Sequence, residues 1–288
     1  MNVLIPKDVP LSAHSEYVKN YTLLTKGTGK LFLFSADHKI EHLDKDFRGS
    51  PISQEIHTPE HLFKIASTAN IGGMATQLGL IARYGSAYSK IPYIIKLNSK
   101  TPLIPIDEKD PLSRILWTVK DVIDFQKSSG LTVTGIGVTV YLGSTYEDLM
   151  LEQAAQAVFQ AHQQGLLAII WMYPRGKAIL HPIDPELLAG AVGVAACLGA
   201  DFVKIHAPEA TKDATRAQLL RTIVEAAGNT KVVTAGGSFK DQAQLIATLK
   251  EDMTIGGTAG AALGRSIFQH TLKDALEVCN SVARCIYT

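Results

Sequence analysis

Short apolar runs alternate with longer helical stretches along almost the whole chain. The runs are rich in β-branched and aromatic residues, as buried strands are, and the stretches between them repeat apolar residues at helical spacing. The expected strands are residues 31–34, 73–78, 93–97, 131–141, 166–173, 202–206, 231–235 and 258–263. The expected helices are residues 59–69, 112–127, 146–164, 185–198, 215–227, 240–250 and 271–286, with only a turn at 84–89 after the second strand. This alternation predicts an α/β fold, a single (β/α)₈ TIM barrel over residues 1–288 with residues 1–30 as an N-terminal extension.

The amino-acid composition fits a large buried core and argues against several classes of partner. Apolar residues make up 46% of the 288 residues, and 28 basic residues balance 27 acidic ones without forming a basic block. We therefore expect neither nucleic acid nor a membrane as a partner. The N-terminus lacks the apolar core of a signal peptide, and the three cysteines show no metal or redox spacing. These features predict a cytoplasmic protein with reduced thiols.

Two long segments follow expected strands. Residues 39–58 come after the first strand, and residues 98–111, with three prolines, come after the third. Barrel enzymes carry their sites at the carboxyl ends of the strands. Long segments without secondary structure are usually functional or disordered, so we expect both to form walls of an active site.

The stretch SADHKIEHLDKD, residues 35–46, contains a motif with two meanings. His38, Glu41 and His42 match H-x-x-E-H, the zinc signature of the inverzincin peptidases. That signature needs a helix, because two histidines four residues apart share a face only at helical spacing. A buried strand is expected directly before it, so we place His38 at a strand end rather than inside a helix. The zinc hydrolase remains an alternative from a different class, and Asp37, which follows the strand directly, argues against a plain solvated loop.

Polar residues and glycines stand at the ends of most expected strands. Because these ends meet at one mouth of the barrel, we expect the following residues to converge there: Asp37, Lys96, Asn98, Tyr141, Tyr173, Lys204, Gly236, Gly237, Gly264 and Arg265.

Lys204 lies inside the apolar strand DFVKIH. A lysine that faces a barrel interior is costly unless it is paired or functional. Desolvation favours its neutral amine, the form that attacks a carbonyl to give a Schiff base. The other reading is a lysine whose stem is buried while its charged end reaches water.

The last two strands end in glycine-rich turns. Gly236, Gly237 and Ser238 follow one, and Gly264 and Arg265 follow the other. Glycines allow backbone N–H groups to approach an anion closely, and the forked guanidinium of arginine fits phosphate oxygens. A single glycine pair is often only a tight turn, but two such turns on adjacent strands predict a phosphate site.

Tyr173 and Trp171 belong to the stretch WMYPRG at the end of the fifth expected strand. Both could be core aromatics that close the strand. For Tyr173, the last strand position before proline, we favour a hydroxyl that faces the mouth and transfers protons. For Trp171 the core and the site are equally good interpretations.

The ordered set ADH…IEH, VTVYLGS, WMYPRGK, GADFVKI, TAGGS and AGAALGRSIFQ resembles the archaeal-type class I fructose-bisphosphate aldolases, the DhnA family. The resemblance implies a Schiff base at Lys204, a strand-one aspartate at Asp37 and a catalytic tyrosine at Tyr173. It also implies phosphate loops at Gly236–Gly237 and Gly264–Arg265, with no metal and no cofactor. The expected activity is reversible cleavage of fructose 1,6-bisphosphate, a sugar phosphate, and the expected assembly is a homo-oligomer, often a decamer.

The chain departs from the family where Lys39 replaces a glycine and Leu43-Asp44 replaces Gly-Pro. These positions border the far end of the substrate, where the acceptor aldehyde binds. A related synthase that makes an amino-dideoxy-heptulosonate is therefore the nearest alternative, and a silent sugar-phosphate-binding barrel is another. The buried lysine argues against the silent barrel, because binding alone gives no reason to bury an amine.

Overall fold

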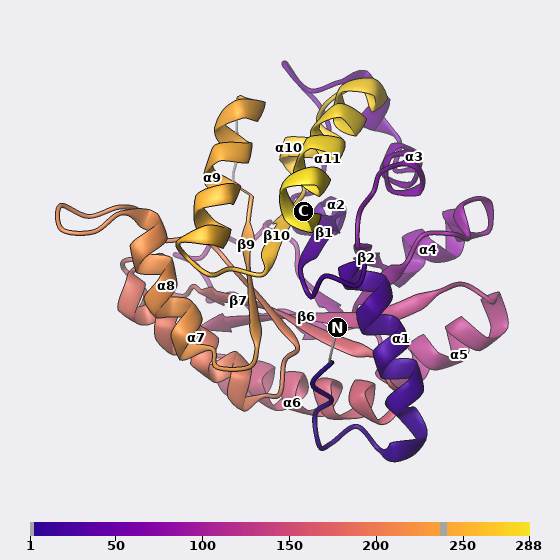
Figure 1. Ribbon diagram of the computed structural model, residues 1–288, viewed down its shortest axis with the longest axis horizontal. Coiled ribbons are helices and arrows are strands. Elements are labelled where there is room, and N and C mark those ends of the chain that lie inside the picture. The colour runs from indigo at the N-terminus through magenta and orange to yellow at the C-terminus, as the bar shows by residue number, and fades with distance from the viewer. Residues whose placement is uncertain (1–2, 237–240) are drawn as a thin grey trace.

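Residues 3–236 and 241–288 are described by a computed structural model, and within them eight parallel strands close into a barrel (Figure 1). Around the barrel the strands follow the order β1, β10, β9, β8, β7, β6, β3 and β2. Their bounds are β1 Leu31–Ser35, β2 Gly73–Gln77, β3 Tyr93–Lys96, β6 Val133–Leu142, β7 Leu167–Pro174, β8 Phe202–Ile205, β9 Lys231–Ala235 and β10 Gly260–Leu263. The predicted (β/α)₈ barrel is confirmed, and each expected strand is present at the expected place in the chain.

Helices cover the outside of the barrel between successive strands (Figure 1). The longer ones are α3 Glu60–Thr68, α4 Leu78–Tyr84, α5 Val119–Ser129, α6 Glu147–Gln163, α7 Pro185–Cys197, α8 Arg216–Ala226, α9 Gln242–Thr254 and α11 Leu272–Tyr287. Single turns occur at α2 His38–Glu41, η2 Gln54–His57, η3 Gly85–Tyr88 and α10 Arg265–Phe268. In the part of the chain that is described, no helix combines the length and apolar character that crossing a membrane requires.

Two helix predictions are wrong in detail. The helix expected over 112–127 begins only at Val119, where Thr118 and Asp121 form a capping box. Its expected first part instead forms β5 (Arg114–Ile115), which pairs with β4 (Asn98–Ser99) in an antiparallel ladder. After β2 the chain forms α4 and then η3 rather than a turn alone.

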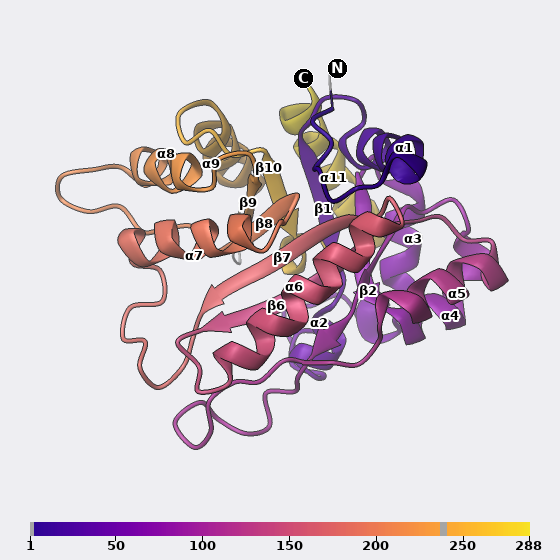
Figure 2. The same ribbon diagram turned by 90° about the horizontal axis from the view of Figure 1, so that it is seen from below.

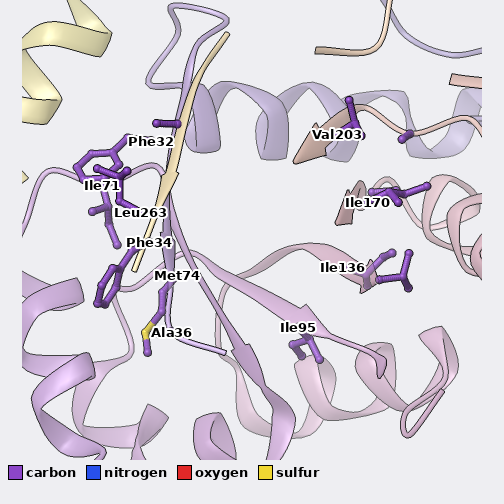
Figure 3. Close-up of a cluster of buried hydrophobic side chains, with 14 of the residues drawn as sticks. Phe32, Phe34, Ala36, Ile71, Met74, Ile95, Ile136, Ile170, Val203 and Leu263 are labelled. Carbon is purple, nitrogen blue, oxygen red and sulfur yellow. The ribbon is translucent and has the colours of Figure 1, made fainter. Parts of the chain in front are cut away.

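Alternation along the strands divides the core into two layers. Residues such as Phe32, Phe34, Met74, Ile170 and Val203 pack outward against the helices (Figure 3). Their neighbours along the strands belong to a second cluster inside the barrel, which includes Leu31, Leu33, Ile169, Trp171 and Phe202. Because side chains alternate between faces along a strand, Ser35, Tyr173 and Lys204 share the inward face with this second cluster.

The N-terminal residues cover the amino end of the barrel, with η1 Leu11–Ala13 leading into α1 His14–Thr25. Figure 2 shows α1 at the end opposite to the loops that follow β6 and β7. The Tyr17 hydroxyl donates a hydrogen bond to Asp201, and the Asn20 amide donates to the Gly165 carbonyl at 2.9 Å. These contacts leave the carboxyl end of the barrel free for a site.

A buried ionic network stabilises the amino end of the barrel. His162 Nδ1 lies 2.8 Å from Asp8 Oδ2, and its Nε2 lies 3.2 Å from Asp201 Oδ2. Asp201 also accepts from the Ala168 N–H at 2.7 Å. Burial alone would lower the pKa of His162, but the bonds to Asp201 and Asp8 raise it to about 9.

Replacing His162 by asparagine is expected to reduce the free energy of unfolding by about 3 kcal/mol at pH 6, because it breaks a buried ion pair. The folded-state pKa of His162 lies above its unfolded value, so its contribution is complete below about pH 6.5. That contribution is lost as the pH rises through about 9. Urea unfolding at pH 6 and pH 9.5 checks this, with the exposed His181→Asn as control. A stability difference that does not narrow at high pH would contradict the assignment.

Candidate active site

A cavity of about 160 Å³ opens at the carboxyl end of the barrel. Its lining includes nine residues expected from the sequence, namely Asp37, His38, Tyr141, Trp171, Tyr173, Lys204, Gly236, Gly264 and Arg265. They come from the ends of β1, β6, β7, β8, β9 and β10, so neighbouring strand ends bring them together. Gly237 and Ser238, also expected here, lie outside the described residues.

Lys204 lies inside the barrel with its side chain buried. Its Nζ donates to Ser35 Oγ at 3.0 Å and lies 5.2 Å from the centre of the Trp171 ring. Burial lowers the pKa of Lys204; the charges of Asp37 and Glu41 oppose this, and those of Lys96 and Arg265 add to it. The net effect is a lowered pKa, which increases the fraction of the nucleophilic neutral amine.

Asp37 stands two residues after the end of β1 and is also buried. Its Oδ2 has no hydrogen-bond partner among the described residues, so this oxygen can accept a bond from a ligand. Burial alone would raise the pKa of Asp37, but Lys204, His38 and Lys96 lower it below the usual value. The carboxylate is therefore ionised beside the amine, where it can accept and return protons.

His38 begins the single turn α2 and packs against Asp37, with Nδ1 3.6 Å from Asp37 Oδ1. Burial lowers the pKa of His38 to about 4, although the Asp37 charge opposes the shift. The imidazole is therefore neutral near pH 7. A Cβ on Gly264 would lie 2.5 Å from the His38 ring, so glycine is needed at this strand end to make room for the histidine.

Tyr173 is the inward residue near the end of β7, and its ring stacks on His206 at 4.8 Å. Burial raises the pKa of Tyr173 well above 10, and the charges of Asp37 and Glu41 add to the effect. The side chain of Tyr173 is therefore a protonated phenol near pH 7. Trp171, two residues earlier, serves both interpretations: it is buried in the inner core and also lines the cavity.

Arg265 and two glycine turns form one side of the cavity. Gly236 and Gly264 follow β9 and β10, and Arg265 begins α10. The Arg265 guanidinium lies 3.9 Å from Asp46, which in turn is 2.6 Å from His42 Nδ1. At 3.9 Å this ion pair is loose, so the guanidinium has donors left for an anion.

Several cavity residues were not singled out from the sequence. Arg175, His206 and Ser35 line the cavity, and so does Glu41, which was considered only as a zinc ligand. Arg175 and His206 each stand two residues beyond a predicted site residue, Tyr173 and Lys204. The period-two rule of strands could therefore have identified them.

The H-x-x-E-H motif does not form the zinc site that its letters suggest. His38 and Glu41 lie on the single turn α2, and His42 caps its C-terminal end. His38 was expected at a strand end outside a helix, whereas in the structure it begins this single helical turn. Glu41 Oε1 lies 3.5 Å from Lys96 Nζ and accepts from Ser99 at 3.3 Å. Across residues 3–236 and 241–288, no group of three or more His, Cys, Asp and Glu side chains could hold a metal ion.

The two long segments differ in their relation to the cavity. Glu41 and His42, from residues 39–58, line it. Residues 98–111 do not line it, but Ser99 donates to Glu41, and Lys100 Nζ lies 6.0 Å from the ring centre of Tyr141, another lining residue. Asp110 instead accepts from the Thr145 N–H at 2.9 Å and the Lys177 N–H at 2.7 Å, so this segment ties together the loops after β6 and β7.

Comparison with known proteins shows that the chain is similar to aldolases. A family model described as DeoC/LacD family aldolase matches residues 31–270. A Methanocaldococcus jannaschii protein named fructose-bisphosphate aldolase/6-deoxy-5-ketofructose 1-phosphate synthase is 50% identical over 281 residues, which are 98% of this chain and 89% of that protein.

Solved structures agree with this finding. A fructose-bisphosphate aldolase from Slackia heliotrinireducens superposes with a TM-score of 0.98 at 44% identity, covering 99% of this chain and 90% of that one. An archaeal fructose-1,6-bisphosphate aldolase whose catalytic lysine is bound covalently to the carbinolamine intermediate has a TM-score of 0.79 at 26% identity, with coverages of 94% and 100%.

Proposed function

The chain belongs to the DeoC/LacD family of aldolases, and from this we propose that it is a class I aldolase that reversibly cleaves fructose 1,6-bisphosphate into dihydroxyacetone phosphate and glyceraldehyde 3-phosphate. The observation that carries the proposal is the buried Lys204 amine, which shares one cavity with Asp37 and Tyr173. A coupled assay of fructose 1,6-bisphosphate cleavage tests it. Activity is expected to be unchanged by EDTA, because the mechanism uses no metal.

The first step takes place at Lys204. Its neutral amine adds to the C2 carbonyl of the ketose, and loss of water gives a protonated imine. The imine accepts the electron pair of the C3–C4 bond as that bond breaks, which releases the aldehyde. Protonation of the resulting enamine at C3 and hydrolysis of the imine then release the ketose phosphate and restore the amine.

Tyr173 and Asp37 are the proposed proton carriers. Tyr173 is a protonated phenol before the imine forms, but a protonated imine on Lys204 places a positive charge nearby and favours the phenolate. That change would let Tyr173 take the proton of the C4 hydroxyl and later deliver one to C3. The ionised Asp37 would orient Lys204 and move protons during imine formation and hydrolysis.

The 1-phosphate of the ketose would bind at the glycine turns. We assign this role to Gly236, Gly237, Ser238, Gly264 and Arg265, with His38 and Trp171 bordering the sugar. Backbone N–H groups and one guanidinium supply the donors that a phosphate needs. The support within the described residues is that Gly236, Gly264 and Arg265 lie together on one side of the cavity.

Replacing Arg265 by alanine is expected to weaken binding of a 1-phosphorylated ketose and to leave the fold intact. A hydrogen bond to a charged group contributes about 1.5–3 kcal/mol, which corresponds to about a 10- to 150-fold rise in Kd. Calorimetric titration of the Lys204→Met background, which cannot turn the ligand over, measures this. Equal affinities with and without Arg265 would remove it from the phosphate site.

A synthase activity is the second candidate, because a relative with 50% identity carries the double name of aldolase and 6-deoxy-5-ketofructose 1-phosphate synthase. That product equals dihydroxyacetone phosphate joined to a three-carbon 2-oxoaldehyde. Supplying fructose 1,6-bisphosphate with and without methylglyoxal, and identifying products by mass, separates the two activities. The amino-dideoxy-heptulosonate synthase stays a further alternative that the same product analysis tests.

We further propose that the protein is cytoplasmic and forms a homo-oligomer, with a decamer as the first assembly to test. Its proposed role is in glycolysis or gluconeogenesis. The support is the family membership and three cysteines without a disulfide among the described residues. Light scattering of the purified protein measures the subunit number.

A further inference from the structure

A second lysine is buried beside the proposed nucleophile and has no part in the mechanism above. Lys96 ends β3, and its side chain is completely buried. Its Nζ lies 2.5 Å from Thr139 Oγ1 and 3.3 Å from the Asn98 carbonyl, with the Glu41 carboxylate at 3.5 Å. A buried charged group is expensive to keep unless it is paired or functional.

Lys96 and Lys204 lie against the same aromatic ring. Lys96 Nζ is 5.0 Å from the centre of the Trp171 ring, and Lys204 Nζ is 5.2 Å from it. Gly137 makes this arrangement possible, because a Cβ there would lie 2.5 Å from the Trp171 ring and 3.2 Å from Lys96 Cδ. The inner layer of the barrel is therefore built to hold two lysines close to one indole.

We propose that Lys96 is a positioning residue of the aldol reaction, whose fixed ammonium beside Trp171 repels a proton from Lys204 and so keeps the nucleophile reactive. This inference rests on the proposed function, since it assumes that Lys204 forms the imine. Among the described residues, every hydrogen-bond or ion-pair partner of Lys96 Nζ is an oxygen that can accept, as suits an ammonium that donates to all of them. Inside the barrel such a charge is screened less than it would be in water.

The field at Lys204 has contributions from several elements. Besides Lys96 on β3, the groups that face it are Asp37 and His38 after β1, Glu41 on α2, Tyr173 on β7, His206 after β8 and Arg265 on α10. The two carboxylates attract a proton to Lys204, whereas Lys96 and Arg265 repel one. Lys96 is buried and Arg265 is about one-third exposed, so solvent screens Lys96 less.

The test compares Lys96→Gln with Thr139→Val. The glutamine removes the charge and keeps a hydrogen-bonding group, while the valine removes the bond from Thr139 and keeps the charge. Circular dichroism and thermal unfolding establish that each variant is folded. The rate of borohydride trapping of dihydroxyacetone phosphate at Lys204 is then measured from pH 5 to pH 10, together with kcat and KM.

For Lys96→Gln the pH at which trapping reaches half its maximum is expected to rise by about one unit, the size of a typical like-charge effect. At pH values well below the wild-type midpoint, trapping and kcat/KM then fall about 10-fold, because the neutral fraction of the amine falls by that factor. Thr139→Val keeps the wild-type midpoint. Glu41→Gln removes an attracting charge, so its midpoint is expected to fall, which separates an electrostatic effect from general damage.

An unchanged midpoint in a folded Lys96→Gln protein overturns the inference while leaving the proposed function intact. A rise of equal size in Thr139→Val would likewise overturn it, because the cause would then be packing. If wild type shows no trapping at Lys204 at all, the proposed function itself has failed. If Lys96→Gln does not fold, the wild-type profile decides: a midpoint near about 10.4, the ordinary value for lysine, overturns the inference.

Discussion

Lys204→Ala is expected to lose turnover by about 10⁴-fold or more, since the covalent step then has no nucleophile. The imine is reversible, but borohydride reduces it to a stable secondary amine. Incubation of wild type with dihydroxyacetone phosphate and borohydride should therefore add one substrate unit to the peptide that carries Lys204. Lys204→Arg is expected to be equally inactive, because a guanidinium remains charged and cannot attack a carbonyl.

The control for this experiment is the position of the label. Lys39, Lys96 and Lys177 also lie towards the carboxyl end of the barrel, so the peptide must be mapped rather than the whole protein weighed. Lys39 forms an ion pair with Asp44, and Lys177 Nζ donates a hydrogen bond to the Glu108 carbonyl at 3.1 Å. Both amines are therefore engaged with a partner. Label on another lysine, or substantial turnover in Lys204→Ala, would refute the central assignment.

Strand positions were predictable because each strand of a parallel barrel is buried on both faces and reads as a short apolar run. The same logic limits Lys204 and Tyr173 to the barrel interior or the helix layer, and in the structure both side chains line the cavity inside the barrel. The start of α5 was not predictable in this way. Ile115 continues an apolar spacing, yet β5 pairs with β4, and this tertiary contact overrides the local pattern.

The departures from the family motifs also become clear only in three dimensions. Lys39 binds Asp44 and lies 4.3 Å from the centre of the Phe47 ring, so two of the departing positions contact each other. Leu43 adopts a φ of 55°, a left-handed conformation in which glycine is less strained. In the sequence Lys39 and Asp44 are separate substitutions, whereas in the structure their side chains contact each other.

The hardest residues to predict were those whose role depends on where the side chain points rather than on the residue type. Glu41 fits a zinc motif by spacing, but its carboxylate turns to Lys96 and Ser99. The sequence around Glu41 does not predict these contacts, because both partners lie at the end of β3 and in β4, far away along the chain. His206 and Arg175 stand one residue past the ends of β8 and β7, so the period-two rule identifies them only when it is extended beyond the strand ends.

Tyr173→Phe is expected to lower kcat for cleavage by about 10²- to 10⁴-fold with little change in KM, as removal of a proton carrier does. The ring and its stacking on His206 remain, so the cavity keeps its shape. The decisive feature is that imine formation should survive. Borohydride trapping at Lys204 is expected to stay within a few-fold of wild type, whereas Lys204→Ala loses both trapping and turnover.

Exchange of the C3 proton of dihydroxyacetone phosphate isolates the step assigned to Tyr173. In deuterium oxide, wild type should exchange this proton through the enamine, and Tyr173→Phe should exchange it more slowly by a factor close to its loss in kcat. Asp37→Asn serves as the contrast, because Asp37 is assigned to imine formation and its loss should slow trapping itself. If instead Tyr173→Phe exchanges as fast as wild type, while Asp37→Asn traps normally but exchanges slowly, the two roles are reversed, and Asp37 rather than Tyr173 transfers the C3 proton.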